Sequence, residues 1–302
     1  ASDPNGNELY TWSWPITQPA ELAQDYLFSN KKNTELKVRV IEDTIKIGAA
    51  GVDFSFSTIN GTITKINNAK GVISFGNGPL PQGVDSKIKN INWYTDESGN
   101  FILEANYTDY PHNSSWTVYK NGMIKLEVSP IRQSLRDIDF IGVSFSYPEE
   151  KCQSIEWLGR GPYRVWKNRI KGSNFGVWEK AYNNTITGES FEELIYPEFK
   201  GYHASLYWAK FGTTESDFTV ISGTPNLYFK LFTPDAPKYV KGDVSPPFPS
   251  GDISFLLEIP AIGTKFQKSN QLGPSGRKGI FKTHQGDDNY PITLLFDFRI
   301  NE

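Results

Sequence analysis

The sequence contains very little of several residue types on which common functional sites depend. Its 302 residues include one cysteine, one methionine and three histidines. Because Cys152 is the single cysteine, no internal disulfide can form, and without a cluster of cysteine and histidine we predict no metal site and no cofactor. No apolar run reaches the roughly 18 residues that cross a bilayer, so we expect no membrane partner.

Charge of either sign is not concentrated along the chain. The 31 basic and 34 acidic residues give a formal net charge of −3, and no stretch gathers the cations into a stripe, so we predict no nucleic-acid binding. The chain also lacks a phosphate-binding loop and a Gly-x-Ser-x-Gly turn, which argues against nucleotide binding and a serine hydrolase. Its first residues lack the basic and apolar regions of a signal peptide, so we expect a mature chain or a piece of a larger protein.

The sequence is rich in aromatic side chains and in short runs in which apolar and polar residues alternate. It has 20 Phe, 15 Tyr and 8 Trp, which favour strands and also stack on the apolar faces of sugars. Asn60-Gly61 and Asn121-Gly122 each separate two such runs, as the turn of a β-hairpin does. Strands are expected at 36–40, 45–47, 52–59, 62–66, 91–95, 101–107, 116–119, 123–128, 139–147, 153–158, 204–211, 217–222, 226–232, 252–259 and 292–300.

These roughly fifteen strands predict an all-β domain over residues 36–302, with two large antiparallel sheets packed face to face. Residues 1–35 are interpreted as an irregular linker with one or two helical turns, in which Trp12 and Trp14 would form a docking strip. Two long loops are expected at Thr233–Gly251 and Ser269–Gly279, and loops of that length are often functional.

The segment from Glu156 to Arg169 brings turn residues, aromatic side chains and cations together within a short stretch of the sequence. It reads Glu-Trp-Leu-Gly-Arg-Gly-Pro-Tyr-Arg-Val-Trp-Lys-Asn-Arg, a strand that ends in a Gly-x-Gly-Pro turn with aromatics and cations around it. Since arginine and lysine are seldom fully buried unless paired, we interpret this turn as the rim of a surface site.

This segment resembles the carboxy-terminal domain of family 2 β-galactosidases, where a Trp-x-Gly-x-Gly-Pro turn leads to an aromatic residue and then an arginine. Near the end, Gly286-Asp287-Asp288 precedes the last expected strand as a Gly-Gly-Asp-Asp turn does in that family. The resemblance implies a galactose mutarotase-like supersandwich that lies downstream of a catalytic (β/α) barrel. The positions that match the first motif are Trp157, Gly159, Gly161, Pro162, Trp166 and Arg169.

The chain departs from the family pattern at three points. Arg164 stands where an acid is common after the proline, and Asn168 stands where an aspartate precedes the arginine. No tryptophan follows Trp208, so the tryptophan that the family's terminal domain lends to the sugar pocket is not carried over. The catalytic carboxylates of the family lie in the barrel, and the βα alternation of a barrel is absent here. We therefore predict no catalytic residue and a non-catalytic accessory domain that packs on the barrel, binds carbohydrate, or both.

A supersandwich also raises an alternative, a stand-alone aldose 1-epimerase with a histidine acid and a carboxylate base. The histidines available are His112, His203 and His284. Alternation over residues 202–208 would place His203 on the same face as Tyr207, where it is either a sugar ligand or a structural residue.

The binding surface that we predict combines the aromatic and cationic side chains of residues 157–208 with the acids of the last turn. Arginine suits the carboxylate of a uronic acid, so an acidic plant polysaccharide is the expected partner and a secreted or periplasmic location is expected. Packing against the barrel uses the same residue types and remains the alternative. The two adjacent acids are too few for Ca²⁺ and better suit turn capping. The predicted residues, carbohydrate-binding or interdomain, are Trp157, Arg160, Tyr163, Arg164, Trp166, Arg169, Trp178, Tyr202, His203, Tyr207, Asp287 and Asp288.

Overall fold

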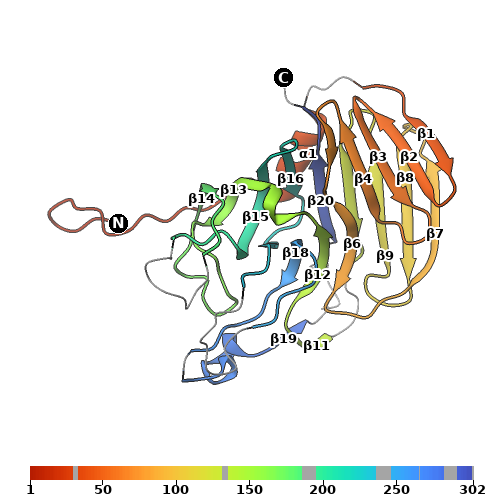
Figure 1. Ribbon diagram of the computed structural model, residues 1–302. Helices are drawn as coiled ribbons and strands as arrows, with labels where there is room; N and C mark the ends of the chain where they lie inside the picture. The colour runs from red at the N-terminus through yellow and green to blue at the C-terminus, as the bar shows by residue number, and fades with distance from the viewer. Residues whose placement is uncertain are drawn as a thin grey trace.

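The computed structural model describes residues 1–29, 33–130, 135–185, 195–235, 246–264, 266–281 and 291–300. Within these ranges the chain is mostly strand, and 18 strands are joined by antiparallel pairing into one large sheet that folds into two layers (Figure 1). The prediction of an all-β, two-sheet antiparallel sandwich is therefore confirmed.

The first layer contains nine strands, each paired with the next. Their order is β7 (Ile88–Thr95), β8 (Phe101–Tyr107), β9 (Asn113–Val118), β10 (Ile124–Val128), β20 (Ile292–Asp297), β16 (Phe218–Ser222), β15 (Gly201–Thr213), β13 (Cys152–Gly161) and β14 (Asn174–Ala181).

The second layer is built in the same way from strands of both halves of the chain. Their order is β1 (Lys37–Ile41), β2 (Thr44–Ala49), β3 (Val52–Ser57), β4 (Ile63–Asn68), β6 (Gly76–Gln82), β12 (Ile141–Ser146), β18 (Ile253–Glu258) and β17 (Tyr228–Leu231). Shorter elements are β5 (Gly71–Ile73), the pair β11 (Leu135–Ile138) and β19 (Gly279–Phe281), and the 3-10 turns η1 (Glu149–Lys151), η3 (Ser269–Gln271) and η4 (Pro274–Gly276).

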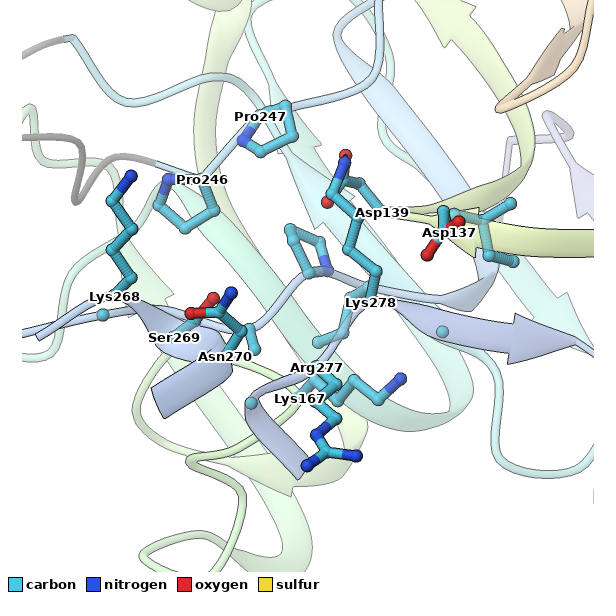
Figure 2. Close-up of a pocket in the computed structure, with 17 residues that line it drawn as sticks. Asp137, Asp139, Lys167, Pro246, Pro247, Lys268, Ser269, Asn270, Arg277 and Lys278 are labelled. Atoms are coloured by element: carbon cyan, nitrogen blue, oxygen red, sulfur yellow. Dashed lines mark hydrogen bonds and ion pairs between the residues drawn. The ribbon is translucent and has the colours of Figure 1, made fainter. Parts of the chain in front are cut away.

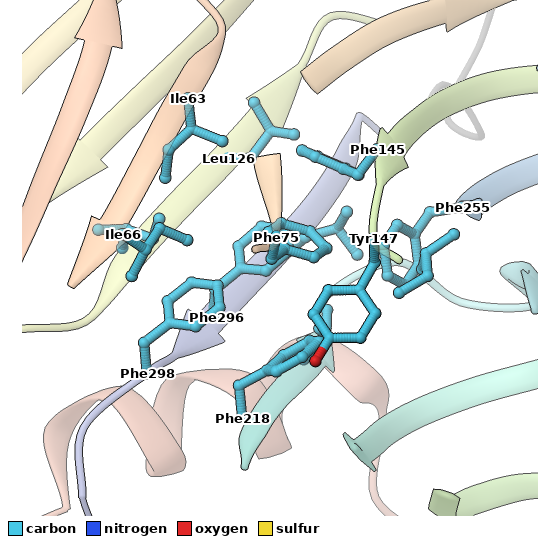
Figure 3. Close-up of a cluster of buried hydrophobic side chains, with 14 of the residues drawn as sticks. Ile63, Ile66, Phe75, Leu126, Phe145, Tyr147, Phe218, Phe255, Phe296 and Phe298 are labelled. Atoms are coloured by element: carbon cyan, nitrogen blue, oxygen red, sulfur yellow. The ribbon is translucent and has the colours of Figure 1, made fainter. Parts of the chain in front are cut away.

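The core lies between the two layers and is rich in aromatic rings (Figure 3). Phe145 of β12 contacts Trp116 of β9 and Phe296 of β20, with ring centroids 6.2 and 5.5 Å apart. All three side chains are almost fully buried. A phenylalanine at such a position stabilises the fold by about 3 to 5 kcal/mol relative to alanine.

Strand β15 belongs to both layers. Gly201–His203 pair with β17 in the second layer, whereas Ala204–Thr213 pair with β13 in the first. The change occurs beside Ser205, whose φ of 54° lies in the left-handed region. Strands that switch sheets commonly do so at such an irregularity. The expected alternation over residues 202–208 is therefore wrong, because Ser205 resets which side each residue faces.

Both predicted hairpins are present. The β3–β4 hairpin contains Gly61 with φ 68° and the β9–β10 hairpin contains Gly122 with φ 82°, so glycine supplies the positive φ that each turn needs. The sequence did not predict β6 and β14. Glycine and proline fill β6, and β14 is a half-exposed edge strand, so neither shows a clear apolar alternation.

The N-terminal segment contains a ten-residue helix, α1 (Pro19–Phe28), which is longer than the one or two turns expected. Its buried Ala23 and Leu27 pack on Ile221 and Leu295 on the outer side of the first layer, and this contact stabilises a helix with weak local signals. Residues before α1 extend away from the body (Figure 1). This helix is too short to cross a membrane, and no other helix in the described ranges has the length and apolar character to do so.

Candidate functional site

The described part of the chain contains a cavity of about 840 Å³ beside the motif turn (Figure 2). Five stretches of the chain line it. Lys167 comes from the turn after β13, Pro246 and Pro247 come from the end of the first long loop, and Ser269–Gly279 form the second long loop. The other stretches are residues 137–139 and residues 259–263, and Lys268 immediately precedes the second loop. The motif and the two loops predicted to be functional therefore meet at one place.

Asn168 shows how the motif turn shapes this cavity. Its Nδ2 donates to the backbone O of Ile262 at 2.9 Å, and its Oδ1 accepts from the N–H of Ile262 at 3.0 Å. The backbone N–H of Lys167 donates to the O of Pro260 at 3.1 Å, and the Arg169 guanidinium donates to the O of Gly263 at 3.3 Å. These bonds fix the chain at 260–263, which forms one wall.

A layer of aromatic rings supports the cavity from behind. Trp166, Tyr202 and Phe248 pack against one another, with ring centroids 5.3 and 4.9 Å from Tyr202 to Trp166 and Phe248 and 5.5 Å between Trp166 and Phe248. The Tyr202 hydroxyl donates to the backbone O of Pro247 at 3.0 Å and holds that lining residue. Burial raises the pKa of Tyr202, so this hydroxyl remains a donor. The predicted Trp166 and Tyr202 thus shape the cavity without lining it.

The cavity lining is rich in charge, mostly positive. The charged side chains are Lys167, Lys268, Arg277, Lys278, Asp137 and Asp139. Lys278 pairs with Asp139 at 2.8 Å, and Lys167 pairs with Glu258 at 3.2 Å. Arg277 is exposed, and no described residue makes a hydrogen bond or ion pair with its guanidinium. An anionic group could enter and meet an unpaired planar donor.

The arginines that we predicted as ligands of a carboxylate are used inside the protein. The Nε of Arg164 lies 3.4 Å from a carboxylate oxygen of Glu198, and both side chains are about nine-tenths buried. Burial lowers the pKa of Arg164, against the opposing charge of Glu198. Arg160 donates to the backbone O of Ser173 at 3.1 Å. Within the described residues, the cation of the cavity that is available to a ligand is therefore Arg277 of the second long loop.

Two further predicted residues, Trp157 and His203, lie in the core with 0% exposure. Their rings are 5.2 Å apart, and neither nitrogen of His203 makes a hydrogen bond of ordinary geometry in the described residues. Burial, followed by the charge of Lys180, lowers the pKa of His203 well below its usual value, so the ring is neutral. A fully enclosed histidine cannot reach a sugar in this structure, which removes support from the epimerase alternative.

Three further predicted residues, Tyr163, Trp178 and Tyr207, do not line the cavity. Tyr163 is half exposed on the turn, and the indole N–H of Trp178 donates to the O of Gly159 at 3.2 Å. The hydroxyl of Tyr207 donates to the O of Thr17 at 3.0 Å and ties the N-terminal segment to β15. Asp287 and Asp288 lie outside the described residues. The described His, Cys, Asp and Glu side chains include no group that could hold a metal ion.

Sequence reasoning missed the individual residues that line the cavity. Arg277, Lys278 and Asn270 lie in the second long loop, so the length of that loop was the one available signal. Asp139 comes from a strand predicted over 139–147, and no local feature marked it as a lining residue.

Comparison with known families identifies a domain that includes the motif turn, whereas most residues of the cavity lining lie beyond the matched range. A family model described as beta galactosidase small chain matches residues 80–245, which is more than half of the chain. The match includes the motif turn and strands β7 to β17, and it ends before the turn at 286–288. A search of curated proteins finds no match.

Proposed function

Since the chain belongs to the beta galactosidase small chain family, we propose that it is a non-catalytic accessory domain of a family 2 glycoside hydrolase. The domain binds an acidic saccharide in the cavity, and its N-terminal segment packs on the catalytic barrel. The parent enzyme is secreted or periplasmic, where polysaccharides are encountered.

The cavity of about 840 Å³ is the observation that carries the saccharide proposal. Its volume falls in the range of small-molecule sites. The unpaired Arg277 suits the carboxylate of a uronic acid because a guanidinium donates two parallel hydrogen bonds. Ser269 and Asn270 supply groups for sugar hydroxyls, and Pro246 and Pro247 offer apolar faces to sugar C–H groups.

The exposed N-terminal side chains support the docking part of the proposal. Trp12, Trp14 and Ile16 are 55%, 75% and 97% exposed. Large apolar side chains gathered in this way are typical of a protein interface. The segment is joined to the body through Tyr207 and α1, so a partner bound to it would be held close to β15.

The family resemblance supports the non-catalytic part, because the two carboxylates of a family 2 enzyme lie in its barrel. The present chain is a sandwich of antiparallel strands. Its most enclosed histidine, His203, has no route to substrate.

Affinity gel electrophoresis of the 302-residue chain tests saccharide binding in the cavity. We expect polygalacturonate in the gel to retard the chain. Arg277→Gln should weaken this retardation by about tenfold, the effect of losing a hydrogen bond between charged groups. Lys89→Gln is the matched control, since Lys89 is an exposed cation of β7 that lies outside the cavity.

Equal retardation of Arg277→Gln and the unmodified chain would refute the cavity as the binding site. Release of reducing sugar from any saccharide by the purified chain would refute the non-catalytic assignment.

A further inference from the structure

The outer face of strands β1 to β4 carries a second concentration of positive charge. A hollow of about 470 Å³ on this face is lined by Lys37, Arg39, Lys46, Gly48, Asp53, Ser55, Lys65 and Asn67, together with Ile47 and Phe54. Four cations against one carboxylate give this face a formal charge of +3, although the whole chain carries −3. The face lies in the part of the sandwich labelled β1 to β4 in Figure 1, away from the loops of the first cavity.

The strand register places three of these four cations in one row across the sheet, and Lys37 lies in the neighbouring row opposite Gly48. Arg39 is directly opposite Lys46, Lys46 is opposite Ser55, and Ser55 is opposite Lys65. Neighbouring strands are about 4.8 Å apart, so Lys46 and Lys65 are roughly 10 Å apart at the backbone. Like charges directly opposite each other destabilise a sheet. The fold therefore carries an electrostatic cost on this face that an anion would relieve.

None of the four cations has its charge neutralised within the described part of the chain. No described residue makes an ion pair or hydrogen bond with the side chains of Lys37, Arg39, Lys46 or Lys65. Lys151, in contrast, pairs with Glu215 at 2.5 Å. All four cations are exposed, so a ligand can reach them.

Protection of an exposed sheet edge does not account for the whole row. Cations on an edge strand discourage pairing with another chain, and that explanation suits Lys37 and Arg39 on β1. Lys46 is on β2 and Lys65 is on β4, which are paired on both sides. These two cations lie within the sheet, where edge protection is not needed.

The neutral and acidic groups of the hollow indicate the kind of anion. Gly48 lies between Lys37 and Asp53 in the register, and a Cβ on it would be 2.9 Å from Oδ1 of Asp53, so the absence of a side chain lets this carboxylate lie over the middle of the face. Asp53 would repel a ligand that is only a polyanion, but it accepts hydrogen bonds from hydroxyls. Phe54, the one aromatic residue of the lining, is fully buried, so nucleic-acid bases have no ring on which to stack.

We propose that the outer face of β1 to β4 is a second binding surface, which holds an acidic polysaccharide by its carboxylates and its hydroxyls. Lys37, Arg39, Lys46 and Lys65 contact the carboxylates, while Asp53 accepts hydrogen bonds from sugar hydroxyls. The choice of a saccharide rests on the proposed function, whereas the site itself is independent of the first cavity.

Affinity electrophoresis of the whole chain with three probes tests this surface. The probes are polygalacturonate, the same polymer with its carboxylates methyl-esterified, and duplex DNA. In the Arg277→Gln chain, whose first cavity lacks its free guanidinium, we expect polygalacturonate to bind more tightly than the other two probes. Adding Arg39→Gln and Lys46→Gln to this chain should weaken the remaining binding by about tenfold or more. The control, Lys87→Gln with Lys89→Gln, removes two exposed cations at β7 and should have no effect.

Asp53→Ala separates saccharide recognition from simple charge attraction, because alanine has no side-chain acceptor. Loss of the hydroxyl acceptor should weaken polygalacturonate binding, whereas stronger binding would show that the surface recognises charge alone and would overturn the proposal. Unchanged binding of the Arg39 and Lys46 double variant, or equally tight binding of DNA, would also overturn it. Because Arg277→Gln alters the first cavity alone, the two sites can fail separately.

Discussion

Lys180 of β14 carries an amine into the core, and its titration makes the stability of the fold depend on pH. The side chain is 5% exposed, its Nζ donates to the backbone O of Glu198 at 2.6 Å, and it lies 5.1 Å from the centre of the Trp157 ring. These contacts favour the charged form, but burial outweighs them and lowers the pKa of Lys180 from 10.5 to about 7.

The sign of the effect follows from where the proton is bound. Between pH 7 and pH 10.5 the unfolded chain keeps the proton on Lys180 and the folded chain releases it. The free energy of unfolding therefore rises with pH in this interval, by at most about 1.4 kcal/mol per pH unit. Between pH 7 and pH 9 we expect a gain of about 1 to 2.5 kcal/mol.

Other buried groups define the window in which this gain can be measured. The lowered pKa of His203 makes the free energy of unfolding rise with pH only below about pH 6.5. Lys230, whose pKa is lowered to about 8, adds to the rise above pH 8. Burial raises the pKa of Cys152 to about 12, which opposes the rise once the unfolded thiol ionises near pH 9. The interval between about pH 7 and pH 9 is therefore the most informative.

Urea denaturation over this interval measures the effect, with Lys180→Met as the test variant. Methionine keeps the length of the side chain and cannot titrate, so the rise with pH should become smaller. The control is Lys210→Met, at an exposed position on β15. Parallel pH profiles for the unmodified chain and Lys180→Met would refute the reasoning.

Two further predictions concern the motif turn and the N-terminal segment. Asn168→Asp replaces the donor to the O of Ile262 by a carboxylate and should lower the free energy of unfolding by about 1 to 3 kcal/mol, as measured by thermal unfolding. Asn270→Asp, at an exposed position, should leave it almost unchanged. Equal shifts for the two variants would contradict a structural role for the hydrogen bonds between Asn168 and Ile262. Trp12→Ser with Trp14→Ser should weaken association of the chain with the separately expressed remainder of the proposed parent hydrolase by about a hundredfold, as measured by sedimentation. Trp93→Ser, at an exposed position on β7, is the control. If the double variant weakened association no more than Trp93→Ser does, docking through the N-terminal segment would be excluded.

The sequence predicted most of the fold because its strands carry local signals. Apolar residues alternate along β2, β3, β8 and β10, and one side of each is buried, so the alternation reports the core directly. The helix α1 was underestimated because its packing on Ile221 and Leu295 depends on strands more than 180 residues away. The division at residue 35 stays a prediction.

The candidate site was less predictable because it depends on which distant segments meet. The motif turn was found from its composition, but whether a cation is free depends on partners such as Glu198, which stabilises Arg164. The row of cations from Arg39 to Lys65 depends on register across four strands and on no linear stripe. Residues paired by tertiary contacts and residues left unpaired have the same appearance in a sequence.

Strand β15 couples the two layers mechanically, because its halves pair with different layers on either side of Ser205. Neither layer can detach without pulling this shared strand out of the other, so the sandwich should lose its structure in one cooperative transition. Tyr202 reaches the cavity wall from one half and Tyr207 holds the N-terminal segment from the other. A force applied to the N-terminal segment would therefore be transmitted along a single backbone to the wall of the cavity.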